Sequence, residues 1–183
     1  RTPLESRFDV ASIGAFGYEL DLSSLPQEEL DVMKEQVKYY KEHRKLLQFG
    51  KYYRLGDVFT ENISGWIIVS EDKSEAMVTV IAQEDHPALF NCENQIKLKG
   101  LDDDALYKVS ARRQSNFDTA EEYTAYGDAL NNGLFNFGEI FMNNDRRENS
   151  NSIGSSMFYI KKVKLNDGGI VQIYSRYKAP RIP

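Results

Sequence analysis

Two acidic residues near the start of the chain have the type and spacing of a catalytic pair. Across residues 16–22 apolar and acidic side chains alternate, which predicts a strand carrying Glu19 and Asp21 on one face. Positions i and i+2 of a strand lie roughly 6.5–7 Å apart, within reach of a paired acid and base. A solvated or ion-paired strand face, or anions beside a helix start, explains the same pattern and is the favoured interpretation.

Other residues with chemical potential are isolated from one another in the sequence. Asp102, Asp103 and Asp104 attract cations, but three consecutive acids cannot all face one ion, so a solvated turn is favoured. His43 falls in a helical stretch and is predicted to lie on the surface. His86 precedes a proline in a connecting segment, which favours a loop role.

Aromatic residues offer stacking platforms for sugars, although in strands they usually form core or cross-strand pairs. The residues considered are Trp66, Tyr52, Tyr53, Tyr107, Tyr123, Tyr126, Tyr159, Tyr174 and Tyr177. Asn62, Ile63 and Ser64 match the glycosylation acceptor pattern, which matters only for a secreted chain. The sequence contains no phosphate-binding glycine loop, nucleophile elbow or HExxH motif, so we assign no catalytic, substrate-binding or metal-binding residue.

Composition narrows the class of protein. With 183 residues, 41% of them hydrophobic, the chain suits one ordinary domain, or a small domain plus part of another. A net charge of −5 with interspersed charges argues against a nucleic-acid binder, and neither a basic block nor a long apolar run suits a membrane. Cys92 is the only cysteine, so a framework of disulfide bonds within the chain is excluded, and its thiol is expected to be inert. One cysteine and two histidines are also too few ligands for a structural zinc site. No cofactor is predicted.

A long helix at 25–49 is the clearest predicted element. Ser24 and Gln27 match a capping box, and Gly50 supplies the stop. The helix carries one apolar stripe, formed by Leu30, Met33, Val37, Tyr40 and Leu47. We expect this stripe to pack on the rest of the chain or on a second copy of it.

The remainder of the chain has the period of strands. The predicted strands are 52–55, 65–70, 75–83, 95–98, 106–112, 155–163 and 170–178, with hairpin turns at 71–74 and 166–169. Residues 120–130 are either a short helix or an irregular loop, and 143–152 form a polar loop. This pattern predicts an antiparallel, hairpin-linked β-domain, a sandwich.

Several runs carry a family resemblance. They are residues 1–7, 10–11, 14–22, Tyr40, Lys41, Arg44, Gln48, Gly50, 53–55, Trp66, 69–73, 100–102, Tyr107, Gly127, Asp128, Leu130, Gly133 and Leu134. In this order they resemble the end of the catalytic barrel and the following domain of glycoside hydrolase family 36 α-galactosidases. The resemblance covers nearly the whole chain; residues 56–59 depart from it, because the family usually has a Ser-Pro-Phe-like step there.

The resemblance implies an α+β fragment. Residues 1–50 would be the last strand and helix of a (β/α)8 TIM-type barrel, and residues 51–183 a C-terminal antiparallel β-sandwich. It implies a retaining enzyme that releases terminal α-1,6-linked galactose from melibiose or raffinose, using one aspartate as nucleophile and another as acid and base. The family's nucleophile lies in a Lys-Trp-Asp-like motif, which this sequence lacks, so the chain alone is expected to be inactive.

The expected partners are the missing catalytic barrel, an α-galactoside bound by the parent protein, and further copies in a homo-oligomer. The chain starts with Arg1, which leads us to expect a fragment or a processed chain. A bacterial, cytoplasmic location is expected from the family. A non-catalytic carbohydrate-binding module and a purely structural, oligomer-forming domain remain the alternatives.

Overall fold

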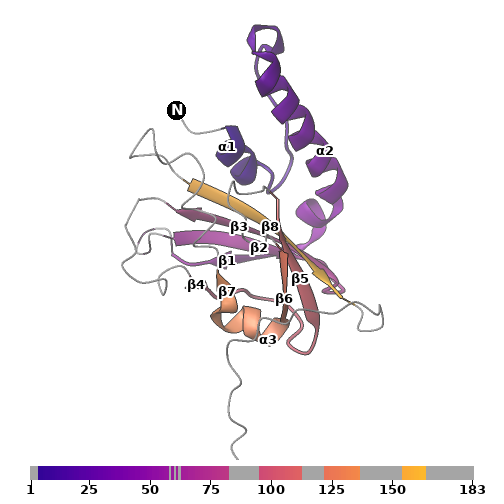
Figure 1. The fold of residues 1–183 in the computed structure, drawn as a ribbon, viewed down its shortest axis with the longest axis vertical. Coiled ribbons are helices and arrows are strands. Elements are labelled where there is room, and N and C mark those ends of the chain that lie inside the picture. Colours follow the sequence, from indigo (N-terminus) through magenta and orange to yellow (C-terminus); the bar gives the residue numbers. More distant parts are fainter. Residues whose placement is uncertain are drawn as a thin grey trace, which may run out of the picture.

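A six-stranded antiparallel sheet forms the centre of the fold. The structure is a computed structural model that describes residues 4–57, 59, 61, 63–82, 95–112, 122–136 and 154–163. The strands of the sheet are β1 (Lys51–Leu55), β2 (Ile63–Val69), β3 (Glu75–Ala82), β8 (Gly154–Lys162), β5 (Leu106–Ala111) and β6 (Glu122–Tyr126), in that spatial order. Strand β8 therefore pairs with β3 and β5, which precede it by many residues in the chain (Figure 1).

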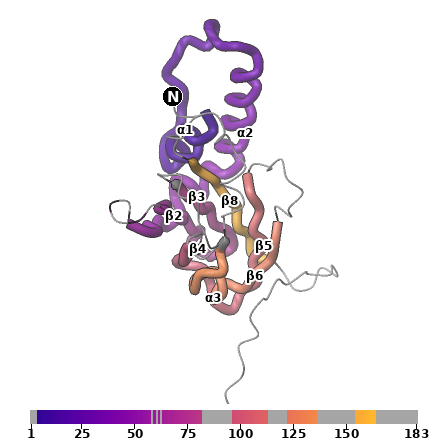
Figure 2. The backbone as a smooth tube through the Cα atoms, turned by 60° about the vertical axis from the view of Figure 1, so that its left-hand side comes forward, coloured from indigo at the N-terminus to yellow at the C-terminus, as the bar shows by residue number. Residues whose placement is uncertain are grey.

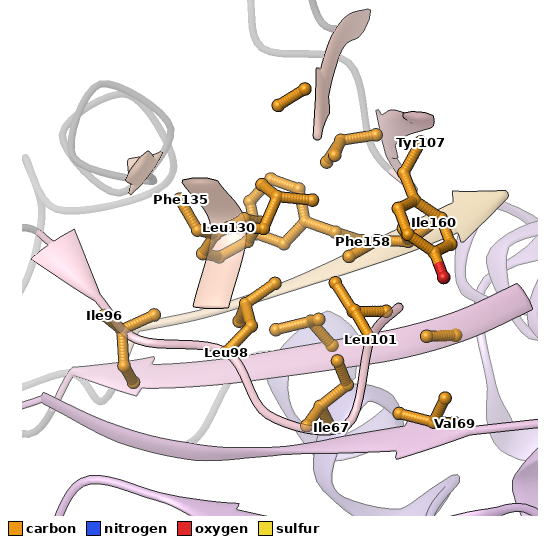
Figure 3. Close-up of a cluster of buried hydrophobic side chains, with 14 of the residues drawn as sticks. Ile67, Val69, Ile96, Leu98, Leu101, Tyr107, Leu130, Phe135, Phe158 and Ile160 are labelled. Atoms are coloured by element: carbon orange, nitrogen blue, oxygen red, sulfur yellow. The ribbon is translucent and has the colours of Figure 1, made fainter. Parts of the chain in front are cut away.

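One face of this sheet packs against a second, smaller layer. The small layer consists of β4 (Gln95–Ile96) paired with β7 (Phe135–Asn136), the short helix α3 (Gly127–Ala129) and a π-helical turn, Leu130–Leu134. Figure 3 shows Leu130 and Phe135 of this layer, together with Leu98 from the segment after β4, in the same buried cluster as Phe158 and Ile160 of the sheet. Burial of these apolar side chains is the main stabilising contribution to the β-domain, at about 1.5–3 kcal/mol for each fully buried large residue.

The opposite face of the sheet is covered by two helices, α1 (Leu4–Ala11) and α2 (Gln27–Phe49). A helix-side cluster joins them to the sheet, and its buried members are Phe8, Tyr40, Leu46, Leu47, Ile68, Met77 and Met157. Because strand side chains alternate, Ile68 points to the helices while Ile67 and Val69 point to the other layer. The N-terminal half of α2 extends beyond the sheet (Figures 1 and 2).

Most of the predicted elements are confirmed. The helix ends as expected at Gly50, whose N–H donates to the Leu46 carbonyl at 2.8 Å. Six of the seven strands are present within a few residues of their predicted bounds, although β4 is only two residues long, and residues 71–74 form the β2–β3 turn. The predicted stripe packs on the sheet through Tyr40 and Leu47. The features predicted at 143–152, 166–169 and 170–178 lie outside the described residues.

The predicted strand at 16–22 is wrong. Residues 16–19 have no regular secondary structure, and a 3-10 turn, η1 (Leu22–Ser24), follows. A strand needs a neighbour to accept and donate its backbone hydrogen bonds, and no described strand lies beside this segment. The predicted capping box is also wrong. Ser24 ends η1 and donates its hydroxyl to the Asp21 carbonyl, while the N-cap of α2 is Pro26 without a side-chain hydrogen bond.

Two further elements differ from the sequence prediction. A short helix or loop was predicted for 120–130. Of these residues, 122–126 are the edge strand β6, 127–129 form α3 and residue 130 begins the π-helical turn. The pairing of β6 with β5, for example Tyr123 opposite Val109, determines this strand. Helix α1, which has only eight residues, was not predicted.

Candidate functional site

The most elaborate polar site among the described residues lies where α1 meets the end of β5. We call it the Arg112 network, formed by Glu5, Asp9, Arg112 and Ser155. The Arg112 guanidinium donates to Asp9 Oδ1 from Nη2 at 2.9 Å and from Nε at 3.2 Å, and to Glu5 Oε2 at 2.5 Å. The hydroxyl of Ser155 donates to the other oxygen of Asp9 at 2.7 Å. Asp9 is 0% exposed, and the Arg112 side chain is 8% exposed.

Local structure explains why these four side chains meet. Glu5 and Asp9 are four residues apart on α1, so both carboxylates lie on the same face of the helix. Arg112 immediately follows β5, and its backbone N–H donates to the Met157 carbonyl at 2.8 Å, which fixes it against β8. Ser155 comes from β8 itself. The network thus joins segments that are separated by more than one hundred residues in the chain.

Aromatic rings and carboxylates surround the buried guanidinium of Arg112. The guanidinium carbon lies 4.7 Å from the centre of the Phe8 ring and 5.8 Å from that of Tyr39, within the range of cation–π attraction. Burial alone would lower the pKa of Arg112, but the charges and hydrogen bonds of Asp9 and Glu5 outweigh it and raise the pKa. The Arg112 network is therefore a buried, charged and hydrogen-bonded connection between α1 and the sheet.

Further hydrogen bonds continue from Glu5 into α2. The side-chain amide of Gln36 donates to Glu5 Oε2 at 2.9 Å and accepts a hydrogen bond from the Tyr18 hydroxyl. Mainly because of burial, with a contribution from Glu5, the pKa of Tyr18 is raised to about 12. Tyr40 donates to the Gly14 carbonyl, so two hydroxyl groups hold the segment between α1 and η1.

The carboxylates of the Arg112 network are placed for structure and not for glycoside chemistry. Both Glu5 and Asp9 contact the same Nη2 of Arg112, so they are as close as the pair of a retaining glycosidase. A catalytic pair, however, needs access to substrate and one group able to give up a proton, whereas Asp9 is completely buried and ion-paired. Among the described residues no cluster of three or more potential metal ligands is found either.

The carboxylates singled out in the sequence do not come together. Glu19 is exposed in the irregular segment, and Asp21 accepts hydrogen bonds from the Ser23 hydroxyl at 2.7 Å and the Ser23 N–H at 2.9 Å. These bonds lower the pKa of Asp21. Asp102 and Asp103 point to different partners: Asp102 pairs with Lys162 at 2.9 Å, and Asp103 accepts from the Asn131 amide at 2.8 Å. The three consecutive acids therefore form a turn, as favoured.

His43 does not lie freely on the surface, which corrects the prediction. Its ring is half-buried, 4.5 Å from the Tyr39 ring and 4.6 Å from the Tyr159 ring. Burial lowers the pKa of His43, and the nearby charges of Glu42 and Glu75 only partly oppose this. The residue is a packing contact between α2 and the sheet. His86, Cys92 and Asn62 lie outside the described residues.

The aromatic residues mostly serve the two cores. Tyr107 is buried, Tyr123 packs against the same core, and Trp66 packs against the helix-side cluster. Tyr52 and Tyr126 are exposed, but they lie on β1 and β6, the two opposite edges of the sheet, and so cannot stack on one sugar chain together. Tyr174 and Tyr177 lie outside the described residues.

The sequence prediction missed the Arg112 network, because its members are ordinary residues whose meaning comes from long-range contacts. The one local signal was the four-residue spacing of Glu5 and Asp9, which becomes visible only once α1 is recognised as a helix. Within the described residues, no helix is long and apolar enough to cross a membrane.

Comparison with known proteins finds two family matches. Residues 63–157 match "Glycosyl hydrolase family 36 C-terminal domain", and residues 1–50 match "Melibiase". The α-galactosidase AgaA of Geobacillus stearothermophilus is 42% identical over 109 residues, which are 58% of this chain and 14% of that protein. The α-galactosidase Mel36A of Lactobacillus acidophilus is 42% identical over 107 residues, again 58% of this chain and 14% of the relative.

Solved structures of such proteins share the fold. An α-galactosidase from Lactobacillus brevis superposes with a TM-score of 0.71 at 31% identity, over 89% of this chain and 20% of that one. A variant of AgaA in complex with raffinose gives a TM-score of 0.68 at 32% identity, with the same coverage of both chains. The chain thus corresponds to a minor part of the length of each relative.

Proposed function

We propose, because this chain belongs to glycosyl hydrolase family 36, that it is the C-terminal part of a retaining α-galactosidase. In this proposal residues 1–50 complete the catalytic barrel, and residues 51–183 form the β-domain that packs on it. The two catalytic aspartates belong to the preceding part of the protein, and this chain contributes structure. The parent enzyme is proposed to release terminal α-1,6-linked galactose from raffinose-type oligosaccharides, which is supported by the raffinose-bound relative.

The Arg112 network is the observation that carries this proposal. Asp9 lies in the segment that matches Melibiase, whereas Arg112 and Ser155 lie in the segment that matches the C-terminal domain. Two family segments that are joined by a buried ion pair and a shared apolar cluster behave as one folded unit. The β-domain is then a rigid support for the end of the barrel, and not a module on a flexible linker.

An exposed apolar surface supports the proposed partner. Val10, Ile13, Leu20 and Leu22 are between 37% and 50% exposed on α1 and the irregular segment that follows it. In the proposed enzyme the preceding part of the same polypeptide covers them. Self-association of the parent enzyme and a cytoplasmic location are further expectations from the family resemblance.

A hybrid protein tests the proposed function. The part of AgaA that corresponds to this chain is replaced by residues 1–183, and hydrolysis of p-nitrophenyl α-galactoside is measured for the hybrid and for the isolated chain. We expect turnover by the hybrid and none by the isolated chain at its correct intact mass. Turnover by the isolated chain, or a folded hybrid without turnover, contradicts the proposal.

A further inference from the structure

Polar contacts run without interruption from the sheet to the irregular segment before η1. We call this series the polar relay: Ser155, Asp9, Arg112, Glu5, Gln36 and Tyr18. We propose that Arg112 is a positioning residue, which fixes residues 12–21 relative to the β-sheet through Glu5 and Gln36. The consequence for catalysis rests on the proposed function, whereas the structural role does not.

The first step of the relay attaches α1 to the sheet. The Arg112 guanidinium is a planar fork that reaches both Asp9 and Glu5, one turn apart on the helix. A lysine at this position would present a single point charge and could not hold both carboxylates in the same geometry. The backbone hydrogen bond from Arg112 to Met157 means that the fork moves with the sheet.

The second step fixes the direction of the Gln36 amide. An amide has a donor end and an acceptor end, and Glu5 accepts the hydrogen bond from Gln36 Nε2 at 2.9 Å. This leaves Gln36 Oε1 pointing to the Tyr18 hydroxyl, which donates to it. Gln36 is only 1% exposed, so water cannot readily replace these partners.

The third step concerns the segment that is held. Residues 12–21 contain no helix or strand, so side-chain contacts determine where they lie. Besides the Tyr18 hydrogen bond, these contacts are the hydrogen bond from Tyr40 to the Gly14 carbonyl and the packing of Phe16 against Phe8, with ring centres 5.0 Å apart. The competing explanation is that this second set of contacts holds the segment without the relay.

Under the proposed function, residues 12–21 belong to the catalytic barrel, because they fall within the Melibiase match. Small displacements of barrel elements change the alignment of reacting groups, even when the substituted residue is far from the substrate. Loss of the relay should then lower kcat with little change in KM.

The titration of Tyr18 distinguishes the two explanations in the 183-residue chain. Its ring carbon is followed by NMR against pH in tyrosine-labelled protein, and Tyr18→Phe assigns the signal. Arg112 lowers the pKa of Tyr18, while burial raises it. If the other contacts hold the segment in place, Arg112→Met only removes a positive charge, and the pKa of Tyr18 rises. If the relay holds the segment, the same change releases the Tyr18 ring into water, and its pKa falls toward the ordinary value of 10.0.

We expect the pKa of Tyr18 to fall in Arg112→Met, because the ring is released. Gln36→Leu removes the acceptor of the Tyr18 hydroxyl, which by itself lowers the pKa of Tyr18, so this variant is kept for the catalytic readout. Arg112→Lys keeps the charge, so a partial fall in that variant reports the loss of the fork. Lys108→Ala is the matched control and should change nothing, since it removes only an exposed ion pair between β5 and Glu122 of β6. A rise in the pKa of Tyr18 in Arg112→Met, or no change in it, overturns the proposal.

The AgaA hybrid provides the catalytic readout. We expect Arg112→Met and Gln36→Leu to lower kcat about tenfold with KM within about twofold, and Lys108→Ala to leave both unchanged. An unsubstituted hybrid without activity contradicts the proposed function, while the Tyr18 titration still decides the role of Arg112. An active hybrid whose variants keep their kcat overturns the catalytic consequence.

Discussion

Removal of the Asp9 carboxylate is expected to be one of the most destabilising single changes in the chain. In Asp9→Ala the guanidinium of Arg112 stays buried, and the ionic partner that it keeps among the described residues is Glu5, whose side chain is 28% exposed. Three hydrogen bonds to Asp9 are lost at once, two from Arg112 and one from the Ser155 hydroxyl. The desolvation cost of Asp9 disappears as well, but that of Arg112 remains and is offset only in part by Glu5.

The balance of these effects sets the expected magnitude. Breaking a buried ion pair by removing one partner typically costs about 3–5 kcal/mol, a large share of the roughly 5–15 kcal/mol that stabilises a domain. For a chain of this size the cost corresponds to a fall in Tm of roughly 6–20 °C. The exposed pair between Lys108 and Glu122, with side chains 46% and 56% exposed, should be worth less than about 1 kcal/mol.

Urea unfolding of the 183-residue chain, followed by the fluorescence of Trp66, measures the free energy of unfolding of Asp9→Ala and of the control Lys108→Ala. Trp66 is the only tryptophan and packs on the helix-side cluster, so it reports separation of the helices from the sheet. Arg112→Met and the double variant Asp9→Ala with Arg112→Met complete the cycle. The double variant should lose less stability than the two single variants together, because Arg112 no longer leaves an unpaired charge buried. A cost for Asp9→Ala no larger than that of Lys108→Ala would falsify this reasoning.

Three further changes test other parts of the structure. Burial lowers the pKa of His43 in the folded chain, so the unfolded chain binds a proton more readily and the fold loses stability as pH falls below 6.5. The midpoint of urea unfolding should fall accordingly, and His43→Gln should remove the contribution of this residue to the fall. Hydrogen bonds from Ser74 and Ser70 lower the pKa of Asp72 to about 2, so the contribution of Asp72 to the free energy of unfolding is complete above about pH 4 and is lost as pH falls through 2. If Asp72→Asn has the same pH dependence of stability as the unsubstituted chain, this prediction is wrong. A Cβ on Gly65 would collide with the Thr79 carbonyl, so Gly65→Ala should cost about 1–3 kcal/mol by thermal unfolding, whereas Gly17→Ala, with open space, should change little.

The parts of the fold that could be predicted are those whose signals are local. Strands β2 and β3 have β-rich sequences and a polar turn between them, and α2 repeats its apolar residues with helical spacing and stops at Gly50. Residues 16–22 show an equally clear alternation and yet form no strand, because a strand also needs a partner. Strand β6 shows the converse: its pairing with β5 makes a strand of residues that were expected to be a helix or loop.

The candidate site was less accessible from the sequence for the same physical reason. Glu19 and Asp21 were the conspicuous carboxylates, but one is exposed and the other caps a turn. Asp9, the carboxylate that the fold buries, acquires its role from Arg112 and Ser155, which are 103 and 146 residues away. The family resemblance did not supply these contacts either, since it concerned fold and activity.

Galactose release from raffinose by the AgaA hybrid tests the central claim most directly. The account predicts that a truncated AgaA without the corresponding part releases no galactose, and that residues 1–183 in its place restore release. A folded hybrid that remains as inactive as the truncated protein would contradict the claim that this chain supplies the structural end of an α-galactosidase.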